Sequence, residues 1–226
     1  MFAILPNLFD RLRCMKLASA LIFAVTLVAA PLFCQGNANP PAEPAVPNLR
    51  DVNSQLLHLV IEDQWDRGND MFSGRHVKTP QDLNVTERDA ERQADVRKLL
   101  AEGKINTGQE YYFAALIFQH SSSSENLLLA HMLAVTSVSK GNVNGKWMSA
   151  ATLDRYLWSI NHPQVFGTQF QRGADGKWTM EPYERTAVSD SIRASWCVVS
   201  LTEQEKILKD SQKGGPLAGT STPDCK

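Results

Sequence analysis

Asp154, His120 and His131 are the side chains of this chain whose types and settings fit acid–base chemistry. Asp154 lies on an expected helix, and the residues three and four positions from it are apolar: Ala150, Ala151, Leu157 and Trp158. A carboxylate on an apolar face needs a hydrogen-bonding partner or has a raised pKa. Asp154 is therefore a general acid or base, a ligand-binding carboxylate, or a structural acid that fixes its helix to the segment that follows.

The two histidines lie on neighbouring expected helices, with His120 at the end of one and His131 inside the next. If these helices fold back about the polar turn at 121–124, the histidines are offset by about six residues, or ~9 Å along the helix axis. That offset does not suit joint binding of one metal ion, and the sequence holds no HExxH or CxxC pattern. We therefore expect no metal and no cofactor. Either histidine is a candidate acid–base partner of Asp154, and His120 could equally interact with the dipole of its own helix.

A polar turn follows the helix of Asp154 in the stretch "HPQVFGTQF". It places Gln164, Gly167, Thr168 and Gln169 together, and such a turn can offer amides, a hydroxyl and closely approached backbone to a small ligand. The same groups could instead satisfy the end of the preceding helix. Arg155 is adjacent to Asp154 in sequence and so points to another side of the helix.

Helical periodicity dominates the chain, so we expect a mainly α fold, a helical bundle or helix-pair array, with one C-terminal β-hairpin. The expected helices cover 53–68, 86–103, 108–120, 125–141 and 145–160, with two short helical pieces in 189–210 and the hairpin at about 165–183. The segment 86–103 has a narrow apolar side and should lie on the surface. The segments 108–120 and 125–141 are apolar nearly all round and should form a central antiparallel pair.

The N-terminus has the order of a secretory signal, in which basic residues precede an apolar run and small residues. We expect cleavage after Ala38, with an uncleaved membrane anchor as the alternative. Residues 39–48 then form a Pro-rich linker, 49–211 one mainly helical domain, and 212–226 a flexible tail. The protein is accordingly expected to be exported to a periplasmic or extracellular location, and to meet the membrane only through the signal segment if that segment stays uncleaved.

Net charge and cysteine content bear on two further questions, which are nucleic-acid binding and disulfide formation. The whole chain has 23 basic and 24 acidic side chains, and the predicted signal contains Arg11, Arg13, Lys16 and Asp10, so the mature net charge is about −3. No basic stripe remains to follow a phosphate backbone, which argues against nucleic acid. Cys197 and Cys225 remain after cleavage, and they either form a disulfide in an oxidising compartment or stay independent thiols, with Cys197 buried.

The runs "YYFAALIFQH", "LLLAHMLAVTSVSKGN", "WMSAATLDRYLW" and "HPQVFGTQF" together resemble a family of uncharacterised, largely bacterial proteins, a domain of unknown function with a Gln-His, Asp-Arg, Gly-Thr-Gln order. The resemblance covers about 111–170 and extends more loosely from Asp63-Gln64 to the segment 189–201. The positions that match the pattern are Gln119, His120, His131, Asp154, Arg155, Gln164, Gly167, Thr168 and Gln169. The resemblance implies a residue set but no reaction.

These observations support three hypotheses. In the first, the chain is a helical module that binds a small polar ligand or a peptide, with Gln119, Arg155 and the Gly167 turn among the binding residues. In the second, it is a hydrolase or lyase in which Asp154 and a histidine form an acid–base pair. In the third, the polar cluster is structural, fully paired and without a cavity.

Overall fold

The computed structural model describes residues 49–69, 71, 84–213 and 220. The described part is mainly helical with a single two-stranded hairpin, which confirms the predicted fold class. Its elements are the 3-10 turn η1 Leu49–Asp51, the helices α1 Ser54–Asp66, α2 Val85–Ala101, α3 Gly108–Phe118, α4 Ser124–Ser139 and α5 Gly145–Ser159, the strands β1 Gln171–Arg172 and β2 Trp178–Thr179, and the helices α6 Asp190–Ser195 and α7 Leu201–Gln212. The predicted signal, the linker and most of the predicted tail lie outside these residues.

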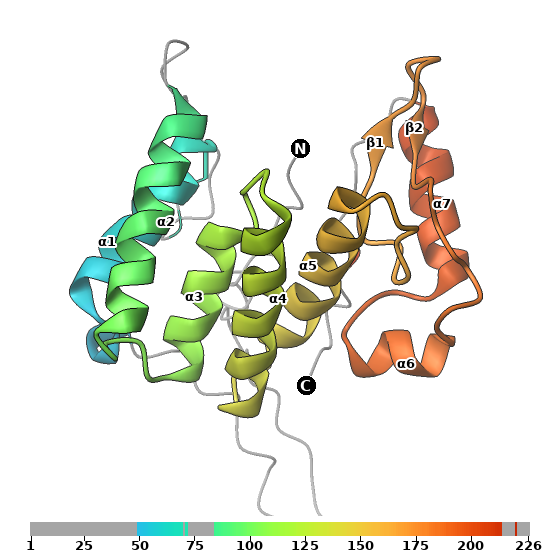
Figure 1. Cartoon of the computed structure of the whole chain (residues 1–226). Helices are drawn as coiled ribbons and strands as arrows, with labels where there is room; N and C mark the ends of the chain where they lie inside the picture. The colour runs from blue at the N-terminus through green and yellow to red at the C-terminus, as the bar shows by residue number, and fades with distance from the viewer. Residues whose placement is uncertain (1–48, 70, 72–83, 214–219, 221–226) are drawn as a thin grey trace, which may run out of the picture.

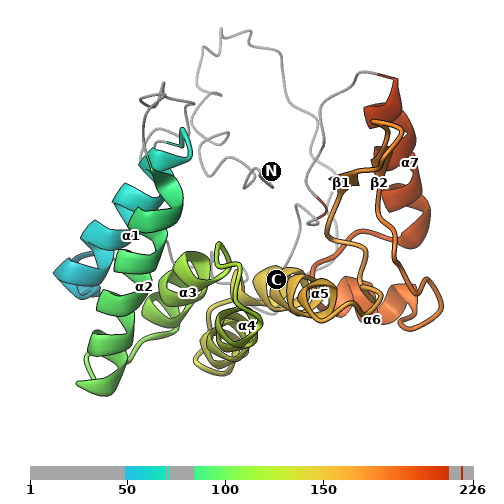
Figure 2. The same ribbon diagram turned by 45° about the horizontal axis from the view of Figure 1, so that its top comes forward.

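The elements follow one another in a curved row (Figures 1 and 2). Helices α1 and α2 lie side by side at one end, α3, α4 and α5 form the middle, and the hairpin with α6 and α7 forms the other end. The most extensive contacts join α3 to α4 and α4 to α5, whereas α1 contacts both α2 and α3. The end of α3 can therefore meet residues from α1 on one side and from α5 on the other.

Helix α1 forms where its sequence predicts. Leu56, Leu59 and Val60 are buried on one face and pack in the main hydrophobic core. The side chain of Asn53 caps the helix, because its Oδ1 accepts hydrogen bonds from the backbone N–H groups of Gln55 and Leu56. The helix therefore enters the core in a fixed orientation, with its last turn beside α2.

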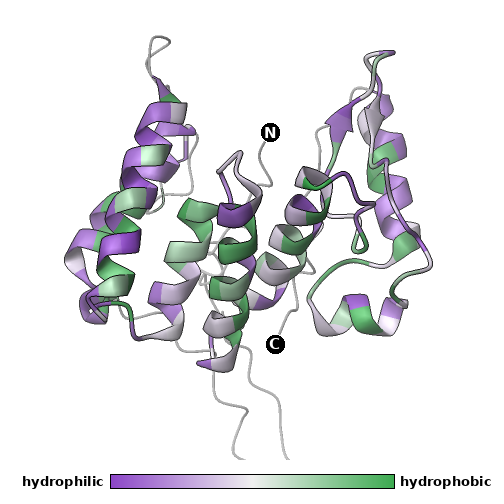
Figure 3. Cartoon of the chain, in the orientation of Figure 1, coloured by the Kyte–Doolittle hydropathy of each residue, from purple (hydrophilic) through white to green (hydrophobic). Residues whose placement is uncertain are grey.

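Helix α2 is more buried than its composition suggests. Val96 and Leu99 bury the expected apolar side in the main core. The preceding turns also face inward, however, and there Asp89 and Arg92 are buried. Figure 3 shows the mixed hydropathy of α1 and α2 beside the more hydrophobic α3 and α4. The interface between α1 and α2 is thus partly ionic.

The middle helices α3 and α4 pack as neighbours, as expected, but only α3 is buried on nearly all sides. Helix α4 exposes Leu128, Met132 and Val135, which corrects the prediction of two equally central helices. Helix α5 approaches α4 closely at Gly145, where a Cβ would lie 2.9 Å from the carbonyl oxygen of Ala134. Only glycine permits that approach without a shift of backbone.

The hairpin is smaller than predicted. Gln171 pairs with Thr179 and Arg172 with Trp178, and the strands have two residues each. The alternating residues expected to begin the hairpin precede β1 instead, and Phe166 packs in a second hydrophobic cluster with Ala150 and Val198. The segment between α5 and β1 is therefore a turn that packs against α5.

Candidate functional site

Asp154 on α5 is fully buried and anchors the turn that follows its helix. Its Oδ1 accepts hydrogen bonds from the backbone N–H groups of Val165 at 2.8 Å and Phe166 at 3.0 Å. Its Oδ2 accepts from the N–H and the hydroxyl of Thr168, at 2.9 and 2.7 Å. Burial raises the pKa of Asp154 above its ordinary value, and these hydrogen bonds oppose that rise only in part. The contacts are those of a structural acid.

The other polar groups of this turn bond to one another. The amide of Gln164 accepts from the N–H of Gln169 at 3.0 Å and donates to the carbonyl of the same residue at 3.0 Å. The side chain of Gln169 donates to the carbonyl of Ala151 at 3.2 Å. Gly167 has φ of 75°, and a Cβ there would lie 2.6 Å from Oε1 of Gln204. The turn therefore closes on itself and on its neighbours.

His131 and His120 have different partners from the one expected. Nδ1 of His131 donates to the carbonyl of Ser149 at 3.0 Å, which joins α4 to α5. Burial lowers the pKa of His131, and this hydrogen bond opposes the effect in part. Nδ1 of His120 lies 3.0 Å from Oδ1 of Asp63 on α1. The expected pairing of a histidine with Asp154 is thus not formed in the described residues, and Asp63 is the carboxylate that meets His120.

Three donors hold the carboxylate of Asp63, which is fully buried. His120 and Nη1 of Arg67, the latter at 2.8 Å, approach Oδ1, while the amide of Gln64 donates to Oδ2 at 2.7 Å. A carboxylate that pairs with a guanidinium is ionised and can only accept hydrogen bonds. Nδ1 of His120 must then carry the proton, and Nε2 has the free electron pair.

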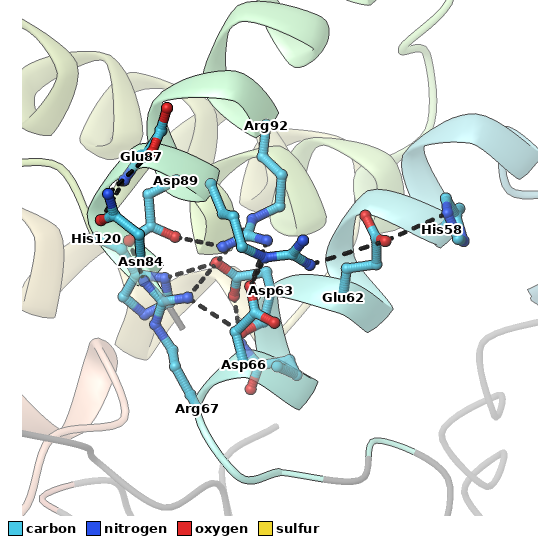
Figure 4. Close-up of polar contacts among 12 residues, drawn as sticks. His58, Glu62, Asp63, Asp66, Arg67, Asn84, Glu87, Asp89, Arg92 and His120 are labelled. Atoms are coloured by element: carbon cyan, nitrogen blue, oxygen red, sulfur yellow. Dashed lines mark hydrogen bonds and ion pairs between the residues drawn. The ribbon is translucent and has the colours of Figure 1, made fainter. Parts of the chain in front are cut away.

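Asp63 belongs to a larger ion-pair network between α1 and α2, shown in Figure 4. At its centre are three carboxylates and three guanidinium groups: Asp63, Asp66, Asp89, Arg67, Arg88 and Arg92. The half-buried Glu62 extends the network through Arg88, at 3.9 Å. Arg92 contacts Asp66 at 2.6 Å and Asp89 at 2.7 Å. Burial alone would raise the pKa of Asp66, but hydrogen bonds from Arg88 and Arg92 outweigh it and hold that pKa below its ordinary value. The six central groups are therefore balanced in charge, and Glu62 adds a fourth carboxylate at the edge of the network.

Arg155 on α5 differs from the arginines of the network. Its side chain is half-buried, and its Nε atom is buried with no hydrogen-bond partner. No carboxylate in the part of the chain that the structure describes forms an ion pair with it. Burial, with a further contribution from the positive charge of Arg67, lowers the pKa of Arg155 to about 10. Among the described residues, Arg155 is thus a cation without a counter-charge.

His120 lies close to the same positive charges. Burial lowers its pKa, the negative charge of Asp63 opposes the effect, and Arg67 and Arg155 both lower the pKa further. Arg155 therefore lies near enough to His120 and Arg67 to act on them electrostatically. Helix α3 contacts both α1 and α5, and we call Asp63, Arg67, His120 and Arg155, whose charges act on one another here, the candidate site.

Gln119 is the remaining residue of the predicted set. It follows the last residue of α3, and its backbone N–H donates to the carbonyl of Ala115 at 2.9 Å. Its side chain is buried, and its amide has no hydrogen bond among the residues described. Of the predicted site residues, His120 and Arg155 are thus within electrostatic reach of each other, whereas Asp154, Gln164, Gly167, Thr168 and Gln169 belong to a separate, internally bonded turn and the helix it packs on.

Asp63 and Arg67 were missed as site residues by reasoning from sequence. A signal was present, because Asp63, Asp66 and Arg67 stand three and four positions apart and so share one face of α1. That face was interpreted as solvent-exposed, which is the usual place for charges on an amphipathic helix. In the structure this face is buried, because charged side chains of α2 form ion pairs with it.

Comparisons with protein-family models, with curated proteins and with solved structures find no match to this chain. The resemblance to a family of unknown function therefore stays a prediction. Among the described residues, no group of three or more His, Cys, Asp or Glu side chains is arranged to hold a metal ion. In the same residues, no helix combines the length and apolar character needed to cross a bilayer.

Proposed function

We propose that this chain is an exported binding module that holds a small ligand through one carboxylate group, with Arg155 as the principal contact. The observation that carries the proposal is the guanidinium group of Arg155, which has a buried Nε and no counter-charge in the described residues. A guanidinium group with a buried, unbonded N–H is in an unfavourable environment, so a ligand that supplies the missing charge gains free energy there. The planar fork of arginine matches a carboxylate in two parallel hydrogen bonds.

The charge balance of the surroundings favours a ligand with a single negative charge. The three carboxylates and three guanidinium groups at the centre of the ion-pair network compensate one another, and the carboxylate of Glu62 lies at the half-buried edge of the network, beside Arg88. The lowered pKa keeps His120 neutral near neutral pH. Arg155 therefore contributes one surplus positive charge, which a carboxylate neutralises. A phosphate dianion would leave one negative charge uncompensated. A free carboxylic acid and the C-terminus of a peptide share this chemistry.

Calorimetric titration tests the proposal with defined probes. The wild-type protein is expected to bind succinamate, which has one carboxylate and one amide, and not the neutral succinamide. Arg155→Ala should weaken succinamate binding roughly tenfold or more, because hydrogen bonds to charged groups contribute about 1.5–3 kcal/mol. Arg155→Lys should restore only part of the affinity, since lysine keeps the charge and loses the fork.

The matched control is Arg172→Ala on the hairpin, which makes the same change in net charge at an exposed residue. It should leave binding unchanged. Equal affinity of wild type and Arg155→Ala for succinamate would overturn the proposal, and so would an absence of carboxylate binding. A clear preference for inorganic phosphate would overturn the assignment of a singly charged ligand.

A further inference from the structure

The geometry around His120 has the features of a general base. Nδ1 donates its proton to Asp63, so Nε2 has a free electron pair. Nε2 has no hydrogen bond to any residue that the structure describes, and the side chain is 12% exposed, so water can reach it. Arg67 and Gln64 fix the orientation of Asp63, which in turn fixes the ring of His120.

The charges that face His120 also suit this role. Asp63 contacts it from α1 and Arg67 pairs with the same carboxylate oxygen, while the positive charge of Arg155 on α5 acts on it electrostatically. Asp63 stabilises the imidazolium that forms when the ring takes a proton, whereas the two arginines and burial keep the ring neutral beforehand. The ring is thus unprotonated near neutral pH, as a general base must be.

We propose that His120, oriented by Asp63, acts as a general base that hydrolyses an ester bond in a ligand whose carboxylate is held by Arg155. This inference rests on the proposed function. It replaces the predicted Asp154 pair with the pair that the structure forms. His120 is the catalytic residue here, Arg155 binds the substrate, and Asp63 is a positioning residue.

The reaction balances with water as the second substrate. The water oxygen bonds to the ester carbonyl carbon while Nε2 of His120 takes a proton from that water, and the carbonyl electron pair moves to its oxygen. The carbon–oxygen bond to the leaving group then breaks, and the leaving oxygen takes the proton back from Nε2. The products are a carboxylic acid and an alcohol, and the imidazole is regenerated.

An ester fits this site better than an amide. General acid–base catalysis contributes about 10²–10⁴-fold to a rate. A single imidazole can supply that gain for an ester with a good leaving group, whereas an amide nitrogen is a much poorer leaving group. The free carboxylate elsewhere in the substrate supplies the positioning, because orientation of the reacting groups adds to the rate only when the substrate is held.

The test uses the monoester of succinic acid with p-nitrophenol, which has both a free carboxylate and an activated ester, and p-nitrophenyl butyrate as the neutral probe. After subtraction of the rate of each ester in buffer alone, the wild-type protein is expected to release nitrophenolate faster from the monoester. His120→Gln should lower kcat about a hundredfold or more with little change in KM. Arg155→Ala should raise KM for the monoester and remove the preference of the protein for the monoester over the butyrate.

His131→Gln is the matched control, because His131 is also a half-buried histidine with one hydrogen bond through Nδ1. It should keep the wild-type rate. Added imidazole should partly restore the rate of His120→Ala, which a purely structural histidine would not allow. For the positioning role of Asp63, histidine side-chain nitrogen NMR of the wild type should show the Nδ1-protonated tautomer of His120.

The outcomes separate the two proposals. Succinamate binding through Arg155 combined with an equal monoester rate in wild type and His120→Gln would overturn the general base and leave the binding function standing. An absence of carboxylate binding would overturn the binding function and this inference with it. If His120→Gln fails to fold, the imidazole rescue of His120→Ala and the tautomer measurement decide whether His120 is a general base.

Discussion

Asp154 and Arg155 are adjacent on α5, yet their side chains belong to different parts of the molecule. Asp154 accepts four hydrogen bonds from the turn at 165–168. The positive charge of Arg155 acts instead on Arg67 of α1 and on His120 at the end of α3. Consecutive residues on a helix differ by about 100° in direction, which accounts for the separation. The turn between α5 and β1 thus holds α5 in place, and α5 carries Arg155.

Asp154→Asn is expected to destabilise the fold by about 1–3 kcal/mol, because an amide cannot accept all four hydrogen bonds and leaves buried donors unsatisfied. Urea unfolding followed by circular dichroism measures the change. Asp210→Asn on the exposed side of α7 is the control and should alter stability by less than about 0.5 kcal/mol. Equal stability of the two variants would show that the turn does not depend on Asp154.

Arg92→Met should destabilise the protein by about 3–5 kcal/mol, because it removes one partner from a buried ion-pair network. Asp66 and Asp89 would each lose an ion pair while remaining buried. Lys98→Met on the exposed side of the same helix is the control. The prediction fails if both variants unfold at the same urea concentration, since Arg92 would then contribute no more than a surface charge.

The stability of the α1–α3 region should fall in acid. Burial would raise the pKa of Asp66 and of Glu110, but arginine hydrogen bonds at Asp66, and backbone N–H groups of Asn106, Thr107 and Asn53 at Glu110, hold both below their ordinary values of 3.8 and 4.5. A carboxyl group with a lowered pKa contributes stability above its ordinary pKa and loses it as pH falls through the lowered value.

The urea midpoint should therefore decrease steeply as pH falls from about 4.5 downward. His120 adds a smaller change at higher pH. Its pKa is lowered below the ordinary 6.5, so the unfolded chain binds the proton more readily, and stability decreases as pH falls below 6.5. Glu110→Gln should flatten the acid part of the profile, and His120→Gln the part just below 6.5. A midpoint independent of pH over this whole range would contradict both assignments.

Cys197 and Cys225 are predicted to form a disulfide, and the described residues place the C-terminal segment suitably for it. Thr220 is buried, its carbonyl accepts from the N–H of Val199 at 2.9 Å, and its hydroxyl accepts from Nε1 of Trp147 at 3.1 Å. Cys225 itself lies outside the described residues. Peptide mapping by mass spectrometry before and after reduction should show the linked peptides, and Cys225→Ser should cost about 2–4 kcal/mol. Two free thiols in protein purified from an oxidising compartment would contradict the pairing.

The sequence allowed good predictions of the helices and poorer predictions of which side chains bond to one another. The helices follow from apolar periodicity, and α1, α3 and α5 formed close to their expected ranges. The short hairpin differs from its alternating pattern because Phe166 and Thr168 pack against α5 instead of pairing in a strand. Side-chain periodicity shows which face of a segment is apolar. It does not show that Asp154 of the preceding helix bonds to the same residues.

The candidate site was predicted only in part for a related reason. His120 and Arg155 were in the predicted set, but Asp63 and Arg67 lie more than fifty residues before His120, and no local pattern joins them. Their burial depends on opposite charges of α2, and such pairing between helices is visible only when the helices are placed in space. Asp154 was predicted as a site residue because its side of the helix is apolar. The turn after its own helix, however, donates all four of the hydrogen bonds that its carboxylate accepts.

Because the carboxylate of Asp63 is shared by the ion-pair network and by His120, protein engineering at this end of the molecule faces a constraint. Replacing the buried charges of α1 and α2 with apolar residues is a common route to greater heat resistance. Here that route would also release the imidazole ring from its orientation. Heat-resistant variants from such a design should therefore be selected on the behaviour of His120 as well as on melting temperature.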